Sequence, residues 1–212
     1  MVTQTTNLER RPSIADLYEE ARRYFMGKGI LNKTLARLSN DLEAHDIDYA
    51  VIGAAALLAH GYPRLTEDID LVMTAEGLQK FHDELVGRGY VPAFPGAKKR
   101  LRSTMDGVLI EVMTTGEYPG DGKPKPVSMP APGEATTEID GIRFVTLEKL
   151  IELKLASGIS AADRLKDLAD VQELIKIRKL EADFALKLNP YVREKYLELE
   201  EAVRNSESSQ EK

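Results

Sequence analysis

The chain contains no cysteine among its 212 residues. This absence excludes disulfide bonds, thiolate zinc sites and cysteine nucleophiles, and it fits a reducing compartment, so we expect a cytoplasmic protein. No apolar run approaches the roughly 20 residues that a membrane-spanning helix needs. The opening stretch, MVTQTTNLERRPS, has no apolar signal core. We therefore expect no membrane partner.

Positive charge is not in excess either. The chain has 29 Lys and Arg against 35 Asp and Glu, which gives a formal net charge of −6 at pH 7. This balance argues against a strongly basic nucleic-acid binder, but it leaves room for a local basic patch. The composition that remains, 42% hydrophobic and 30% charged, suits one globular domain with appended helices or two small domains.

Alternating apolar segments and turn signals predict an α+β protein in four parts. Residues 1–12 are polar and are expected to be disordered. Residues 13–145 are expected to form a sheet domain with N-terminal helices. Residues 146–205 are expected to be a C-terminal helical segment, and the polar residues 206–212 a disordered tail.

Within the helical segment, local signals predict where individual helices begin and end. Gly158 is expected to end one helix, and Ser160 is expected to cap the next, over residues 161–178. A last helix is expected to begin at Pro190 and to end near Arg204.

The chain is organised around an Asp-x-Asp pair, Asp68 and Asp70, inside the apolar run 68–73. Two residues apart on a strand, both carboxylates project from one face. Such a pair is unfavourable alone, because like charges repel and burial penalises both. A hard divalent cation would offset this, and magnesium is typically held by one or two carboxylates together with substrate phosphates.

The residues upstream suit those phosphates. Residues 48–52 predict a short buried strand, and residues 54–60 predict a helix, with Gly53 between them. A glycine at this point lets backbone approach a ligand closely, and a helix start offers free N–H groups to an anion. A phosphate-binding turn followed by an Asp-x-Asp strand is typical of a nucleotide-using transferase.

The chain has Ile52-Gly53-Ala54, then a spacer of about a dozen residues, then Asp68-Ile69-Asp70. This pattern resembles the signature of the DNA polymerase β-like nucleotidyltransferase superfamily. The resemblance implies a nucleotidyltransferase-fold mixed β-sheet with flanking helices, followed by a C-terminal helical segment. The superfamily usually has Gly-Gly or Gly-Ser where this chain has Gly53-Ala54. Ala54 keeps the backbone N–H but supplies no hydroxyl.

The run RLTEDID, from Arg64 through Thr66 to Asp70, is similar to the form found in the AbiEii-type branch, which contains bacterial toxin and abortive-infection proteins. This likeness places Arg64 and Thr66 at the nucleotide. From the residues alone, Arg64 could equally contact a phosphate or neutralise the acidic pair.

The superfamily completes its metal site with a third carboxylate on a neighbouring strand. Glu111 is the one charged residue in the apolar run 108–113, and a lone charge in such a strand needs a partner. Glu111 therefore matches the third position, although the family more often has Asp there. Asp106 is the alternative, but the sequence Met105-Asp106-Gly107 suits a hairpin turn.

A second cluster of charged residues lies in FVTLEKLIELKLASGISAADRLKDLADVQELI, which resembles the downstream motifs of AbiEii-type proteins. The resemblance implies that Lys154 and Asp167 contact nucleotide phosphates or maintain the site. Arg164, Lys166 and Asp170 are further candidates. The spacing also fits ordinary solvated ion pairs on one helix, worth a few tenths of a kcal/mol, so Lys166 and Asp170 stay open.

The densest basic run, KKRLR, lies on a predicted strand. Alternation places Lys98, Arg100 and Arg102 on one of its faces. Such a face could meet a polyanionic acceptor such as RNA, but a solvated strand face is the commoner explanation. The Gly- and Pro-rich residues 115–134 predict a long loop, either a surface excursion or a flap beside the site.

Together these features predict a metal-dependent nucleotidyltransferase that moves an NMP from an NTP to an acceptor hydroxyl on RNA, protein or a small molecule. The AbiEii-type resemblance adds the expectation of a toxin-like role with a cognate antitoxin or partner protein. The alternative is a catalytically degenerate protein that binds nucleotide or a protein partner. Two Mg²⁺ ions are expected on Asp68, Asp70 and Glu111, with NTP as substrate. The expected catalytic residues are Asp68, Asp70, Glu111 and Lys154, and the expected nucleotide-binding residues are Gly53, Ala54, Arg64, Thr66, Arg164, Lys166 and Asp167.

Overall fold

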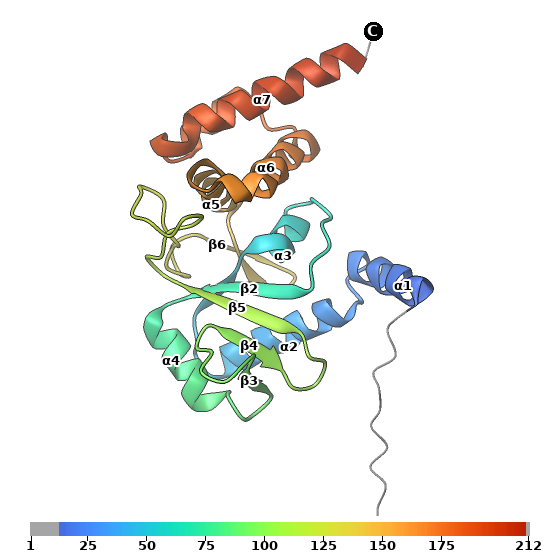
Figure 1. Cartoon of the computed structure of the whole chain (residues 1–212), viewed down its shortest axis with the longest axis vertical. Coiled ribbons are helices and arrows are strands. Elements are labelled where there is room, and N and C mark those ends of the chain that lie inside the picture. The colour runs from blue at the N-terminus through green and yellow to red at the C-terminus, as the bar shows by residue number, and fades with distance from the viewer. Residues whose placement is uncertain (1–12, 211–212) are drawn as a thin grey trace, which may run out of the picture.

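The computed structural model describes residues 13–210. Within this range a mixed seven-stranded sheet lies between helices, and a helical segment follows it (Figure 1). The predicted α+β class is therefore confirmed, while residues 1–12 lie outside the described range. The helices are α1 (Ile14–Phe25), α2 (Ile30–Ala44), α3 (Gly53–Ala59), α4 (Ala75–Glu84), α5 (Leu147–Ser160), α6 (Leu165–Arg178) and α7 (Pro190–Gln210), with short 3-10 helices η1 (Ala162–Arg164) and η2 (Ala182–Lys187).

The sheet has the strand order β3-β4-β5-β2-β1-β7-β6. Its central strands β2 and β5 are parallel, whereas β1 and β4, on either side of them, are antiparallel to their central neighbours. The strands are β1 (Tyr49–Val51), β2 (Asp68–Met73), β3 (Tyr90–Pro92), β4 (Arg100–Ser103), β5 (Leu109–Thr114), β6 (Thr136–Ile139) and β7 (Ile142–Val145).

The register places charged residues side by side across three strands. Asp70 on β2 pairs with Glu111 on β5, and Glu111 pairs in turn with Arg100 on β4. Residues directly opposite each other on paired strands share a face of the sheet. Asp70, Glu111 and Arg100 therefore form one row on one face.

The two faces of the sheet have different cover. Figure 1 shows α2 and α4 on one side and α3, α5 and the following helices on the other. The Tyr90 hydroxyl donates a hydrogen bond to Asp41 of α2 at 2.7 Å, and its ring packs edge-on against Phe81 of α4. The face opposite to the charged row is therefore the one that α2 and α4 cover.

The hairpin predicted at Met105-Asp106-Gly107 is confirmed, and a second hairpin lies between β6 and β7. β4 and β5 flank the Met105-Asp106-Gly107 turn. β6 and β7 are joined at Asp140 and Gly141, which both have positive φ (52° and 75°). A two-residue hairpin turn of type I′ requires positive φ at both central residues. The predicted long loop is confirmed too, because neither helix nor strand lies between Thr114 and Thr136.

The predicted helix end at Gly158 is wrong. Gly158 lies inside α5, and a Cβ there would come within 2.5 Å of the Leu168 side chain on α6. The glycine therefore lets two helices approach closely instead of ending one. Ser160 is not the cap of the next helix, because its hydroxyl donates to the Ala156 carbonyl within α5 at 2.8 Å. A short η1 turn follows, and α6 begins only at Leu165.

The predicted end of the last helix near Arg204 is also wrong. α7 continues to Gln210, so residues 206–210, expected to be disordered, are helical, while 211–212 lie outside the described range. Glu and Gln are good helix formers, so the composition of this stretch does not oppose a helix. None of the described helices combines the length and apolar character needed to cross a bilayer.

Candidate active site

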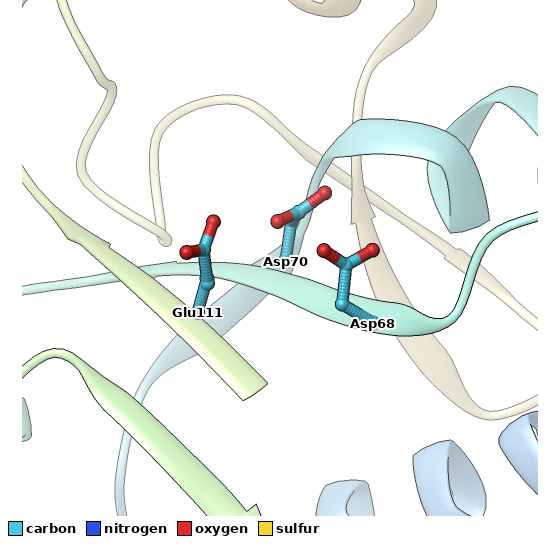
Figure 2. A group of neighbouring side chains, drawn as sticks. All are labelled: Asp68, Asp70 and Glu111. Atoms are coloured by element: carbon cyan, nitrogen blue, oxygen red, sulfur yellow. The ribbon is translucent and has the colours of Figure 1, made fainter. Parts of the chain in front are cut away.

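Three carboxylates converge where β2 and β5 lie side by side. Asp68, Asp70 and Glu111 each offer an oxygen within 4.8 Å of the others. Figure 2 shows the three side chains projecting from the same face of the two strands, with Asp70 beside the start of α3. The predicted third carboxylate, Glu111, is thus placed next to the Asp-x-Asp pair.

Asp106, the alternative third carboxylate, lies elsewhere. Its Oδ2 accepts hydrogen bonds from the Thr34 hydroxyl at 2.6 Å and from Arg37 at 2.9 Å, both on α2. Asp106 therefore links the β4–β5 hairpin to α2 through these hydrogen bonds, on the face of the sheet opposite to the three carboxylates.

The surroundings of Asp70 oppose its ionisation. Burial raises the pKa of Asp70 most, and the negative charges of Asp68 and Glu111 raise it further, to about 7. The positive charges of Lys154 and Arg64 oppose this rise in pKa without cancelling it. The protein therefore concentrates more negative charge here than its own cations neutralise.

The donor set fits a hard divalent cation. Carboxylate oxygens are the ligands that Mg²⁺ prefers, and an added cation would relieve the repulsion that raises the pKa of Asp70. Two of the three carboxylates are also held in orientation. Thr66 donates to Asp68 at 2.5 Å, and Arg100 forms an ion pair with Glu111 at 2.5 Å.

Gly53 is required by the position of Asp70. Its φ is +64°, and a Cβ on it would lie 1.9 Å from Oδ2 of Asp70 and 2.9 Å from its Cβ. No side chain fits there unless Asp70 moves. Ala54, the next residue of α3, is buried. Gly53 thus makes room for a carboxylate, while phosphate binding by Gly53 and Ala54 stays a prediction.

We expect Gly53→Ala to destabilise the fold more than Gly122→Ala does. Gly122 has nearly the same φ, +70°, but nothing lies within 4 Å of a Cβ placed on it. Gly122→Ala should cost only backbone strain, about 1–2 kcal/mol. Gly53→Ala should cost about 1–3 kcal/mol more for the overlap with Asp70. Urea unfolding measures both losses.

The double variant Gly53→Ala/Asp70→Ala removes the carboxyl group that overlaps at 1.9 Å and leaves only the 2.9 Å contact with the Cβ of residue 70, so it should recover most of the extra loss. Equal losses in Gly53→Ala and Gly122→Ala would show that the Asp70 contact does not constrain this position.

A network of ion pairs lines the same cavity as Asp68, Asp70 and Glu111. Lys154 of α5 donates to Asp167 at 2.9 Å and to Asp170 at 2.7 Å, both on α6. Arg64 donates to the same Asp170 oxygen at 2.8 Å. Asp170 is only 3% exposed, so it is the buried centre of the network. The Ser157 hydroxyl donates to Asp167 at 2.7 Å.

The helix-surface pairs that spacing suggested are replaced by these longer-range contacts. Asp170 pairs with Lys154 and Arg64, while Lys166 is exposed to solvent. Burial by itself would raise the pKa of Asp167, but the charge of Lys154 and the Ser157 hydrogen bond outweigh it and lower that pKa. Arg164 contributes to the same lowering by its charge alone.

One cavity of about 300 Å³ joins the acidic and basic groups. All the predicted site residues except Lys166 line it. Further lining residues were not predicted: Ser157, and Pro119, Gly120 and Met129 of the long loop. Ser157 was within reach of prediction, because it lies three residues after Lys154 and so on the same helix face. No local signal identified the loop residues.

Comparisons with known proteins give a distant likeness. No family model matches the chain, and no curated protein matches it. Among solved structures, it is similar to nucleotidyltransferase-like proteins from three organisms. One is from Paracoccidioides brasiliensis, at 19% identity and TM-score 0.45, over 68% of this chain and 74% of that chain.

A second similar structure comes from Helicobacter pylori, at 17% identity and TM-score 0.44, over 94% of this chain and 98% of that chain. A third comes from Thermotoga maritima, at 19% identity and TM-score 0.40, over 69% and 89%. The sequence identities and TM-scores are low, so the function has to be inferred from the site itself.

Proposed function

We propose that the protein is a metal-dependent nucleotidyltransferase that moves a nucleoside monophosphate from a nucleoside triphosphate to an acceptor hydroxyl. One observation carries the proposal: three carboxylates suited to a divalent cation line the same cavity as Lys154 and Arg64. A metal-bound triphosphate needs both kinds of group, ligands for the metal and cations for the phosphates.

Asp68, Asp70 and Glu111 are the residues that would hold the metal, for which we propose two Mg²⁺ ions. When bound, these ions supply a lowered pKa at the acceptor hydroxyl and neutralise charge on the leaving pyrophosphate. Arg64, Lys154 and Arg164 supply positive charge for the triphosphate. Asp167 and Asp170 position Lys154, and Gly53, Ala54 and Thr66 form the wall of the nucleotide site.

The proposed reaction is a single displacement at phosphorus. The acceptor oxygen forms a bond to the α-phosphorus while the bond from that phosphorus to the oxygen bridging the β-phosphate breaks. Pyrophosphate leaves with the bonding electron pair. The proton of the acceptor hydroxyl passes to a carboxylate, for which Glu111 is the candidate.

The biological setting that we propose is less direct. A toxin-like role, and a cognate antitoxin as partner, rest only on the similarity of RLTEDID and RLKDLAD to the AbiEii-type motifs.

Label transfer tests the reaction. The protein is incubated with Mg²⁺ and each α-labelled nucleoside triphosphate, together with total RNA or cell extract, and EDTA-treated samples serve as controls. We expect label in a macromolecular band only when Mg²⁺ is present. Pyrophosphate release without such a band would indicate a small-molecule acceptor.

A negative result in this assay would contradict the proposed function. If no triphosphate yields label or pyrophosphate, the protein is not a nucleotidyltransferase under these conditions. A Mg²⁺-dependent thermal shift with nucleotide but no turnover would then favour the alternative, a degenerate nucleotide-binding protein.

A further inference from the structure

A row of basic side chains runs along β4, beside the acidic site. Arg100 pairs across the strands with the proposed metal ligand Glu111, and Arg102 pairs with Leu109. Arg100 and Arg102 are two residues apart on one strand, so they share the face that carries the carboxylates. Lys98 was predicted on the same strand face, but it lies in the bend before β4, where it is exposed. These three residues are called the β4 basic row.

The β4 basic row lies on an open part of the sheet. Lys98, Arg100 and Arg102 are exposed, and the Arg100 side chain is 54% exposed. Within residues 13–210, the helices that pack against β3 and β4 lie on the other face, where Arg37 of α2 donates to Ser103 at 2.9 Å. Figure 1 shows α2 and α4 together on that side.

The charge of the row is local. The chain as a whole carries a formal net charge of −6, so a concentration of cations beside an acidic site is not a general property of its surface. Arg102 donates to the Gly107 carbonyl at 2.6 Å, and a guanidinium has five N–H donors. Its other donors are available to a second acceptor.

We propose that the β4 basic row binds the phosphodiester backbone of a nucleic-acid acceptor, whose terminal sugar hydroxyl enters the acidic site. This inference rests on the proposed function and adds the class of the acceptor to it. Side chains two apart on a strand are separated by about 6.6 Å, a spacing suited to successive phosphates of an extended strand. Arg100 lies opposite Glu111. Arg102 lies opposite Leu109, the strand partner of Asp68, so a strand bound along the row would run beside the carboxylates.

Fluorescence anisotropy with short labelled single-stranded oligonucleotides tests the proposal. The test variant is Lys98→Ala/Arg102→Ala, which leaves the Arg100–Glu111 pair intact. The matched control is Lys33→Ala/Arg88→Ala, which removes the same net charge from two exposed residues outside the row. We expect roughly tenfold weaker binding in the test variant, and a salt slope reduced by about 1.4, since each phosphate contact on a single strand contributes about 0.7.

Comparing an oligoribonucleotide with an oligodeoxyribonucleotide of the same sequence shows whether the acceptor is RNA or DNA, since only RNA offers a 2′-hydroxyl. Tighter binding of one identifies the acceptor type, and equal binding assigns recognition to phosphates alone. Nucleotide-dependent thermal shift is measured in parallel and should not change in the test variant.

Three results would overturn the proposal: no binding of either oligonucleotide by the unmutated protein, unchanged binding by the test variant, or an equal loss in the control. If oligonucleotide binding fails while the nucleotide thermal shift persists, the acceptor assignment fails and the proposed function stands. If the nucleotide shift is absent but the row binds as expected, the proposed function is the part that fails.

Discussion

Asp70→Asn is expected to reduce nucleotidyl transfer by about a thousandfold or more, while the metal-free protein melts at an equal or higher temperature. The activity falls because an amide is a poor ligand for Mg²⁺ and the carboxylate oxygens are the proposed metal-binding atoms. The stability holds or rises because Asp70 lies within 4.8 Å of two other carboxylates. Relief of about 1 kcal/mol of repulsion corresponds to about 2–4 °C in a chain of this size.

Asp106→Asn is the matched control, because it makes the same chemical change at a carboxylate with the opposite environment. Partial burial alone would raise the pKa of Asp106, but hydrogen bonds from Thr34, Arg37 and Ser103 outweigh it and hold that pKa at about 2. Asp106→Asn should therefore lower the melting temperature and leave the response to Mg²⁺ unchanged.

Thermal melts with and without Mg²⁺, together with the label-transfer assay, measure these effects. Asp70→Asn should also lose the stabilisation that Mg²⁺ gives to the unmutated protein. A marked fall in its metal-free melting temperature would mean that Asp70 is structural, and retention of the Mg²⁺ response would remove it from the metal site.

Asp170→Asn is expected to destabilise the protein by about 3–5 kcal/mol, the typical cost of removing one partner from a buried ion pair. Asp170 is 3% exposed, and one of its oxygens accepts from both Arg64 and Lys154. An amide leaves Lys154, itself only 7% exposed, with Asp167 as its one remaining carboxylate contact among those described. Urea unfolding measures the loss.

Glu173→Gln is the control for this prediction. Glu173 lies on the same helix and forms an exposed ion pair with Lys176, three residues away. Exposed pairs of this kind contribute at most about 1 kcal/mol, so the control should unfold close to the unmutated protein. If Asp170→Asn lost no more stability than Glu173→Gln, the buried network would not be a stabilising element of this fold.

Features with a local cause could be predicted from the sequence. The strand Asp68–Met73 has the predicted bounds, because an apolar run with a repeat of two residues specifies its own conformation. Thr146 caps α5 by accepting a hydrogen bond from the Lys149 N–H, which is a local interaction that threonine favours at this position. The meeting of Glu111 with the Asp-x-Asp pair was predictable too, but only through the resemblance.

Features that depend on which surfaces meet could not be predicted. Spacing along α6 suggested Lys166 as the partner of Asp170, yet the observed partner is Lys154, 16 residues away on α5. The choice depends on which face of α6 is buried, and helical spacing alone does not specify that. Gly158 was misread for the same reason, because its function is contact with Leu168 on the next helix.

The ion pair between Arg64 and Asp170 spans 106 residues of chain, and this separation has a consequence for synthesis. A ribosome completes all three carboxylates before it has made α5 and α6. A growing or truncated chain therefore carries the acidic cluster without Lys154 and without the carboxylate that positions Arg64. The candidate site is completed only after α5 and α6 have been made and have docked, so under the proposed function an incomplete chain would lack transferase activity.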